Sequence, residues 1–327
     1  MIPLEPDAAR AVVADVRMRA RLADSLDYIF EQSEGRLALP PPEARAGFLS
    51  RLAAEPVPPL VFANYCDAVL AIGAGENDRA EALLAEIVAM PAQHRLSIDV
   101  IGDPADDPVA ERIERMIDTD PARSFSLVAP TAEMADACGA LVARALDMIE
   151  RGDPALAAEF HALVRQIILV DTVGEGAAEL AGASSFMLWG AVLLNARVHT
   201  DLIELVAALA HESGHNLLFG LAADGPLVLN EDFERFTSPL RSDLRPMDGI
   251  IHAVYVVARV HRSLSVLLRS GVFSAREADR VRAGLTQQAD VYRRGLKTVR
   301  AEARLTPLGQ KVMAGVEAYM DGVLEPA

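Results

Sequence analysis

The chain has 327 residues, 51% of them hydrophobic, which is enough to bury a substantial core. Lys and Arg total 31 against 47 Asp and Glu, so the formal net charge is −16. Such a charge repels phosphate backbones and anionic lipid surfaces. The composition therefore argues against nucleic acid as a partner and against binding to a membrane surface.

Neither a secretion signal nor a membrane segment is indicated. The first twenty residues mix charged residues with short apolar pairs and lack the apolar core of a signal peptide. The longest apolar run, 186–194, is about half of the roughly 20 residues that a membrane helix requires. Cys66 and Cys138 are isolated, as expected of core thiols in a reducing cytosol. We therefore expect a cytoplasmic protein.

Helical periodicity dominates the first half of the chain. Apolar residues recur at helical spacing from residue 6 to about residue 34, and Gly35 follows as a stop. Proline-rich segments then separate shorter elements. The further elements expected before residue 151 are helices near 43–54, 60–72, 77–89, 107–118 and 131–150, and a brief strand within 96–101.

The sequence Arg-Gly-Asp-Pro at 151–154 is the clearest break in the middle of the chain. We place a boundary there, between an N-terminal helical region, 1–153, and a C-terminal region, 154–327, which we expect to form one compact unit together.

The second region begins with strand-like sequence. Residues 164–170 are mostly apolar and rich in β-branched side chains, and 184–195 contains another strand-like run, so a small sheet is expected. Asp201 then resembles the N-cap of a helix that ends at Gly220. Residues 221–246 are expected to form a loop, followed by helices at 247–268, 275–300 and 306–324. The expected fold class is mainly α with a small β-sheet, or α+β.

The most definite chemical pattern is H-E-x-x-H at 211–215, inside the helix that follows the sheet. His211 and His215 leave the same helical face four positions apart and can bind one metal ion, with Glu212 beside them. Gly214 costs about 1 kcal/mol in a helix interior relative to Ala, so it indicates a close approach of another element. A metal helix beside a short sheet is a zincin-like arrangement.

Two imidazoles do not complete a catalytic site, because zinc and non-heme iron commonly take three protein ligands. The sequence offers five candidates for the third: His199, Glu231, Glu234, His252 and His261. A glutamate ligand would indicate a zinc metallopeptidase in which Glu212 is the general base that deprotonates the metal-bound water. However, Glu231 and Glu234 lie in a predicted loop, where acids are more often solvated than bound to a metal.

His252 lies in an almost wholly apolar helical segment, where an unpaired imidazole would be costly to bury. This favours His252 as a ligand over a core histidine. His261, flanked by two arginines, is expected at the surface.

The segment 238–246 brings Arg241 and Arg245 close in sequence to His252. Arginine holds a carboxylate by two parallel hydrogen bonds. A peptidase does not require this pair of arginines. An oxygenase that uses a dicarboxylate co-substrate requires at least one such cation.

Taken together, the motif at 211–215, S-P-L-R at 238–241, D-x-R-P at 243–246 and Gly249-x-x-His252, preceded by the segment 184–190, resemble the HExxH-type 2-oxoglutarate-dependent peptide β-hydroxylases. These enzymes modify ribosomally made peptide natural products. The resemblance covers roughly residues 165–265. Its discriminating part is the stretch from 238 to 252, since many peptidases share H-E-x-x-H.

The resemblance implies Fe(II) bound by His211, His215 and His252, with the distal carboxylate of 2-oxoglutarate held by Arg245 or Arg241. Glu212 would orient a ligand or a bound water.

It further implies hydroxylation of a side-chain β-carbon in a peptide, such as a precursor with a leader segment, and a substrate pocket lined by Trp189 and Phe186. Two alternatives stay open at this point: a zinc-dependent metallopeptidase, and a non-catalytic helical scaffold with a structural or degenerate metal site. The oligomeric state, including a homo-oligomer, is also left open.

Overall fold

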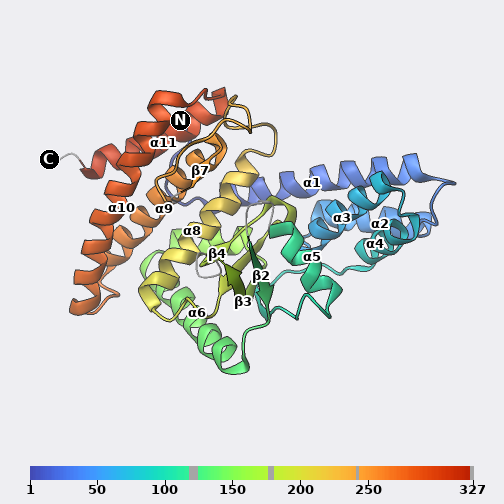
Figure 1. Cartoon of the computed structure of the whole chain (residues 1–327), viewed down its shortest axis with the longest axis horizontal. Helices are drawn as coiled ribbons and strands as arrows, with labels where there is room; N and C mark the ends of the chain where they lie inside the picture. The colour runs from blue at the N-terminus through green and yellow to red at the C-terminus, as the bar shows by residue number, and fades with distance from the viewer. Residues whose placement is uncertain (118–123, 176–179, 241–242, 325–327) are drawn as a thin grey trace. The chain divides into compact units, whose positions relative to one another are not determined.

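The structure is a computed structural model that describes residues 1–117, 124–175, 180–240 and 243–324 (Figure 1). It is mainly helical with a small sheet, which confirms the α+β class. The chain divides into two compact units, each assembled from segments that are distant in sequence. Unit 1 comprises Met1–Ala8, Leu141–Phe160 and Asp201–Ala327, and unit 2 comprises Ala9–Ala140 and His161–Thr200.

The helices of unit 2 confirm the elements expected from the periodicity. Gly35, with φ of 73°, takes the left-handed conformation just after the first helix, where the sequence placed the stop. The helices are α1 (Ala8–Ser33), α2 (Pro42–Ala54), α3 (Leu60–Ala74), α4 (Asn77–Ala89) and α5 (Pro108–Ile117).

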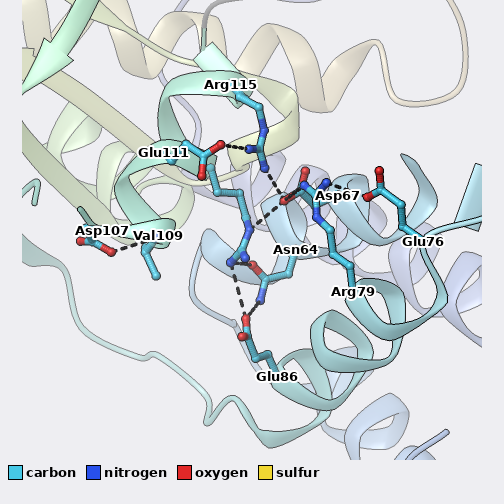
Figure 2. Close-up of polar contacts among 10 residues, drawn as sticks. Asn64, Asp67, Glu76, Arg79, Glu86, Asp107, Val109, Glu111 and Arg115 are labelled. Atoms are coloured by element: carbon cyan, nitrogen blue, oxygen red, sulfur yellow. Dashed lines mark hydrogen bonds and ion pairs between the residues drawn. The ribbon is translucent and has the colours of Figure 1, made fainter. Parts of the chain in front are cut away.

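A buried aspartate on α3 forms ion pairs with arginines on two neighbouring helices, α4 and α5 (Figure 2). Asp67 is 1% exposed, and its Oδ2 accepts from Arg112 Nε at 3.0 Å and from Arg115 Nη2 at 2.6 Å, both on α5. Arg79 on α4 pairs with the same oxygen at 3.1 Å. Because three guanidinium groups converge on one buried carboxylate, the packing of α3, α4 and α5 depends on this charge.

The sheet of unit 2 has the strand order β1-β3-β5-β4, with β2 also paired to β3. The neighbours β1–β3 and β3–β5 are parallel, and β2 and β4 pair antiparallel. The strands are β1 (Ser97–Val100), β2 (Ser124–Val128), β3 (Gln166–Glu175), β4 (Gly182–Ala183) and β5 (Ala191–Asn195). The three strand-like runs identified in the sequence all contribute to this sheet, and a short 3₁₀ turn, η2 (Phe186–Leu188), precedes β5.

Unit 1 is built around long helices, with α9 packed against α8, α10 and α11 (Figure 1). The break at 151–154 separates α6 from α7 and lies inside unit 1. A two-stranded pairing of β6 with β7 lies within the segment expected as a loop. The remaining elements, of which α6 begins and α7 ends in unit 2, are α6 (Ala132–Gly152), α7 (Pro154–Leu163), α8 (Leu202–Leu221), β6 (Phe236–Thr237), β7 (Leu244–Arg245), α9 (Met247–Ser270), α10 (Ala275–Glu302) and α11 (Pro307–Leu324).

Helix α9 is the centre of the apolar core of unit 1. By length and composition it could also cross a membrane, but 89% of its apolar stretch is buried inside the protein, as in the core helix of a globular domain. Arg259 on α9 and Glu159 on α7 form an ion pair in which both side chains are 0% exposed. Arg259 Nη1 also donates to the carbonyl oxygen of Leu4 at 2.8 Å. The buried arginine therefore joins α9, α7 and the N-terminal segment.

The expected surface position of His261 is wrong. His261 is 7% exposed, and its Nδ1 lies 3.0 Å from the hydroxyl oxygen of Tyr319 on α11. The two arginines that suggested a surface are themselves engaged, Arg259 with Glu159 and Arg262 with Asp153. Arginine beside a histidine therefore does not indicate exposure where each guanidinium has a buried carboxylate partner.

Candidate metal centre

Helix α8 carries the H-E-x-x-H motif and begins at a well-formed cap. The carboxylate of Asp201 accepts hydrogen bonds from the backbone N–H of Ile203 at 3.0 Å and of Glu204 at 3.2 Å. His211 lies at the middle of the helix and His215 one turn later. Glu212, between them in sequence, is buried at 5% exposure.

Gly214 allows α9 to pack closely against the motif. A Cβ added at Gly214 would lie 3.3 Å from Cγ1 of Val256 and 3.6 Å from Cγ of Arg259, both on α9. This contact confirms the close approach expected from a glycine inside the helix. Because His252 precedes Val256 by about one turn of α9, the same contact brings His252 beside the motif histidines.

The structure places three imidazoles in contact. His211 Nε2 lies 3.2 Å from His215 Nε2, and His215 Nδ1 lies 3.0 Å from His252 Nδ1. The rings of His215 and His252 are nearly parallel, at 18°, and the ring of Phe219 stacks on His215 and lies 5.0 Å from that of His252, centroid to centroid. His252 is thus the third-ligand candidate that the structure shows in contact with the motif.

Burial keeps these imidazoles neutral. It lowers the pKa of His211 to about 4, with a smaller contribution from His252. Burial, together with the neighbouring histidines, also holds the pKa of His215 well below its ordinary value. The pKa of His252 is lowered by burial and raised in part by the carboxylate of Asp248. Neutral imidazoles keep the lone pairs that bind a metal ion.

The distances can be compared with those around a metal ion. Two nitrogens bonded to one ion at about 2.0–2.1 Å lie roughly 3 Å apart, so the His211–His215 separation of 3.2 Å suits a shared ion. His215 turns Nε2 to His211 and Nδ1 to His252. These two nitrogens point in different directions and cannot bind the same ion, and in the described ranges no group of three or more His, Cys, Asp or Glu side chains is arranged so that it could hold a metal ion.

Glu234, a candidate ligand of the peptidase hypothesis, is engaged elsewhere. Its carboxylate accepts hydrogen bonds from the backbone N–H of Glu231 at 2.9 Å and from Arg304 at 2.6 Å. Because these donors stabilise the carboxylate, chiefly the Glu231 N–H, the pKa of Glu234 is lowered. Glu231 is exposed, and His199 in unit 2 lies 2.8 Å from the carbonyl oxygen of Ala181.

Of the two arginines singled out for a carboxylate ligand, Arg241 lies outside the described residues. Arg245, at the end of β7, pairs with Asp243 at 3.1 Å. A Cβ added at Gly249, in the first turn of α9, would lie 3.8 Å from Cβ of Arg245. Since Gly249 precedes His252 by about one turn, Arg245 lies beside the part of α9 that carries His252.

The two aromatic residues expected to line a substrate pocket lie in unit 2. Trp189 is 2% exposed, and its indole N–H donates to Asp15 on α1 at 3.1 Å, so it is anchored in the core. Phe186, three residues earlier, is 55% exposed. Their role in binding a substrate stays a prediction.

Asp248 was missed by the sequence reasoning. Its Oδ2 lies 3.7 Å from Nε2 of His252. The i, i+4 spacing of the two residues on a predicted helix was the available indication.

No protein-family model matches the chain, and no curated protein matches it in sequence. The case for a function therefore depends on the arrangement of the residues described above.

Proposed function

We propose that this chain is an Fe(II)- and 2-oxoglutarate-dependent oxygenase that hydroxylates a side-chain β-carbon of a ribosomally synthesised peptide. The observation that carries the proposal is the contact of His252 with His215 at 3.0 Å, next to the 3.2 Å pair of His215 with His211. It supports His252, and not a glutamate, as the candidate for the third ligand. Because His215 faces His211 with Nε2 and His252 with Nδ1, binding of one ion by all three histidines requires one of these rings to turn.

The donor set fits iron. Imidazole nitrogens suit iron and zinc alike, and His211, His215 and His252 would hold the ion. When bound with 2-oxoglutarate and O₂, the iron supplies the oxidation of a C–H bond to an alcohol, while 2-oxoglutarate is converted to succinate and CO₂. The protein's own contribution is to bind the reactants and to keep the three imidazoles neutral and in place.

Arg245 is our candidate for binding the distal carboxylate of 2-oxoglutarate. Its guanidinium already binds one carboxylate, that of Asp243 at 3.1 Å, and the Asp243 side chain is 45% exposed. A dicarboxylate could therefore replace Asp243, which would turn toward solvent. An arginine is suited to this exchange because it stays charged and offers paired donors.

A zinc peptidase is the main alternative. Two observations weaken the version with a glutamate ligand: Glu234 is held by Arg304, and His252, not a glutamate, is in contact with His215. A peptidase would still require Glu212 as its general base, whereas an oxygenase would use Glu212 at most to orient a ligand or a water. Glu212→Gln should therefore abolish peptidase activity but leave part of an oxygenase activity. A structural metal site in a non-catalytic scaffold would show neither activity.

The decisive test is anaerobic reconstitution with Fe(II) followed by titration with 2-oxoglutarate. We expect the visible charge-transfer band of a chelated oxo-acid. Arg245→Gln should weaken the binding of 2-oxoglutarate by at least about tenfold, because one charge-assisted hydrogen-bonded pair is lost. Arg293→Gln is the matched control, since Arg293 pairs with Asp290 on the surface of α10. Tight zinc binding with no band in the presence of Fe(II) would exclude the oxygenase.

Activity itself is tested by mass spectrometry. A candidate precursor peptide encoded beside the gene, incubated aerobically with protein, Fe(II) and 2-oxoglutarate, should gain the mass of one oxygen atom. Shortening of the peptide without an oxidant would instead identify a peptidase.

A further inference from the structure

Strand β1 lies at the end of the sheet of unit 2, and among the described residues it pairs with β3 alone. The backbone N–H groups of Ser97 and Ile101 donate to the carbonyl oxygens of Arg165 and Leu169, at 3.0 Å each. Neighbouring residues of a strand turn their backbone N–H and C=O groups to opposite sides. The odd-numbered residues of β1 therefore face β3, and the even-numbered residues face the open edge of the sheet.

The open edge of β1 is formed by Ile98 and Val100. Their backbone N–H and C=O groups point away from β3, and no hydrogen-bond partner for them lies in the part of the chain that the structure describes. Their side chains are 39% and 51% exposed and lie on the same face of the sheet. Proteins commonly protect such an edge with Lys or Pro. Strand β1 has neither, and it shows two exposed apolar side chains instead.

The geometry of this edge selects the kind of partner. Unpaired backbone groups that recur every second residue are matched by the backbone of another extended chain. Such a chain gains main-chain hydrogen bonds to Ile98 and Val100, and its own side chains of one face pack beside theirs. The partner is therefore an extended polypeptide segment, and not a helix or a small molecule.

The charge around the edge narrows the choice further. Asp103 and Asp106 are exposed in the turn after β1, and this turn folds back on the strand, because a Cβ added at Gly102 would collide with Oδ2 of Asp107. Arg95 is an exposed base before the other end of β1. The acids attract a basic segment, whereas a second copy of a chain with a net charge of −16 is repelled.

We propose that the open edge of β1 binds an extended basic peptide segment, which joins the sheet as a further strand with its basic residues beside Asp103 and Asp106. The proposal rests on the proposed function only in taking a peptide as the partner. It assigns to unit 2 a docking surface that shares no residue with the candidate metal centre.

The probe is a fluorescein-labelled peptide of alternating Val and Thr that ends in a pair of Lys residues. It is titrated by fluorescence anisotropy with the full chain after treatment with a chelator. We expect saturable binding that added salt weakens. The same peptide N-methylated along its central residues should not bind, because it lacks the main-chain donors. No binding of the first peptide, or equal binding of both, would overturn the proposal.

Val100→Pro tests the edge itself. Proline lacks the N–H that faces the open edge, while the neighbouring residues keep their bonds to β3. Binding of the basic probe should weaken by about fivefold or more, since one hydrogen bond is lost and the ring obstructs the partner strand. Val100→Thr is the matched control, because it keeps the N–H and the β-branched shape, and it should bind nearly as the wild type does. Equal binding by Val100→Pro and the wild type contradicts the proposal.

The charge is tested without any change in the strand. Asp103→Asn combined with Asp106→Asn should weaken binding of the basic probe by about two- to fivefold at low salt and leave it unchanged at high salt. Asn keeps the hydrogen bond that Asp103 Oδ1 accepts from the N–H of Ala105. Asp290→Asn is the matched control, since Asp290 is an exposed acid on α10. A probe with Glu in place of Lys that binds as tightly as the basic probe would refute the choice of a basic partner.

Sedimentation velocity of the protein without peptide tests self-pairing. We expect Val100→Pro to sediment as the wild type does. A wild-type dimer that Val100→Pro dissociates would identify a second copy as the occupant of the edge and overturn the proposal. These measurements need neither Fe(II) nor 2-oxoglutarate. A failure of the oxygenase therefore leaves them unaffected, and a loss of probe binding says nothing against the oxygenase.

Discussion

Burial of His211 makes the metal-free protein sensitive to acid. Its pKa falls from an ordinary 6.5 to about 4 in the folded protein. The unfolded chain therefore binds the proton more readily than the folded protein does. The contribution of neutral His211 to the free energy of unfolding is fully present above about pH 6.5 and is lost as the pH falls toward 4. The difference between the two pKa values corresponds to roughly 3 kcal/mol. Because the side chain keeps part of its surface in solvent, we expect about 1–2 kcal/mol.

The assay is urea unfolding of chelator-treated protein between about pH 7.5 and 5, for the wild type and for His211→Gln. The variant should lose less stability over this interval, since its side chain cannot take up a proton. Carboxylates whose pKa is lowered by hydrogen bonds to arginine, such as those of Asp171 and Asp201, lose their contribution at lower pH and do not enter this window.

His94→Gln provides the matched control, because His94 is an exposed histidine of unit 2. It should keep the pH dependence of the wild type. If His211→Gln instead loses stability with the wild-type slope, burial does not hold His211 in its neutral form and the reasoning is refuted. Added Zn(II) should stabilise the wild type more than His211→Gln, since a ligand bound to the folded state raises its stability.

Three further predictions follow from the packing. Glu159→Gln should lower the free energy of unfolding by about 3–5 kcal/mol, because it leaves Arg259 buried without its partner; an unchanged urea midpoint would contradict this. Gly214→Val should cost about 1–3 kcal/mol by overpacking against Val256 and should also weaken Zn(II) binding, whereas Gly214→Ala should be mild on both counts. Asp67→Asn should destabilise unit 2 by about 3 kcal/mol, visible as a lower melting temperature, and leave Zn(II) affinity unchanged.

Local sequence determined most of the helices because their ends carry strong signals. Proline begins α2 and α11, and glycine in the left-handed conformation follows α3 and α9. The sheet was less predictable. Strand β2 was not expected, and β3 continues to Glu175, beyond the apolar run, because its second half pairs with β2. Such pairing depends on residues 43 to 51 positions away along the chain, which periodicity alone does not reveal.

In the candidate site, too, features that depend on local spacing could be predicted, and features that depend on distant contacts could not. The motif and the isolation of His252 in an apolar helix could be recognised in the sequence, because both depend on local spacing. The position of His261 could not, since its burial depends on buried partners for the neighbouring arginines and on Tyr319. Asp248 could be noticed only once the helix that carries His252 had been located.

The contact between α8 and α9 is formed by the core and not by a loop. Gly214 meets Val256 and Arg259, and Arg259 is fixed in turn by its buried pair with Glu159. These contacts lie one residue from His215 on α8 and about one to two turns from His252 on α9. The spacing of the two imidazoles is therefore set by the same packing that stabilises unit 1. A substitution that loosens this core should weaken metal binding even when every histidine is intact.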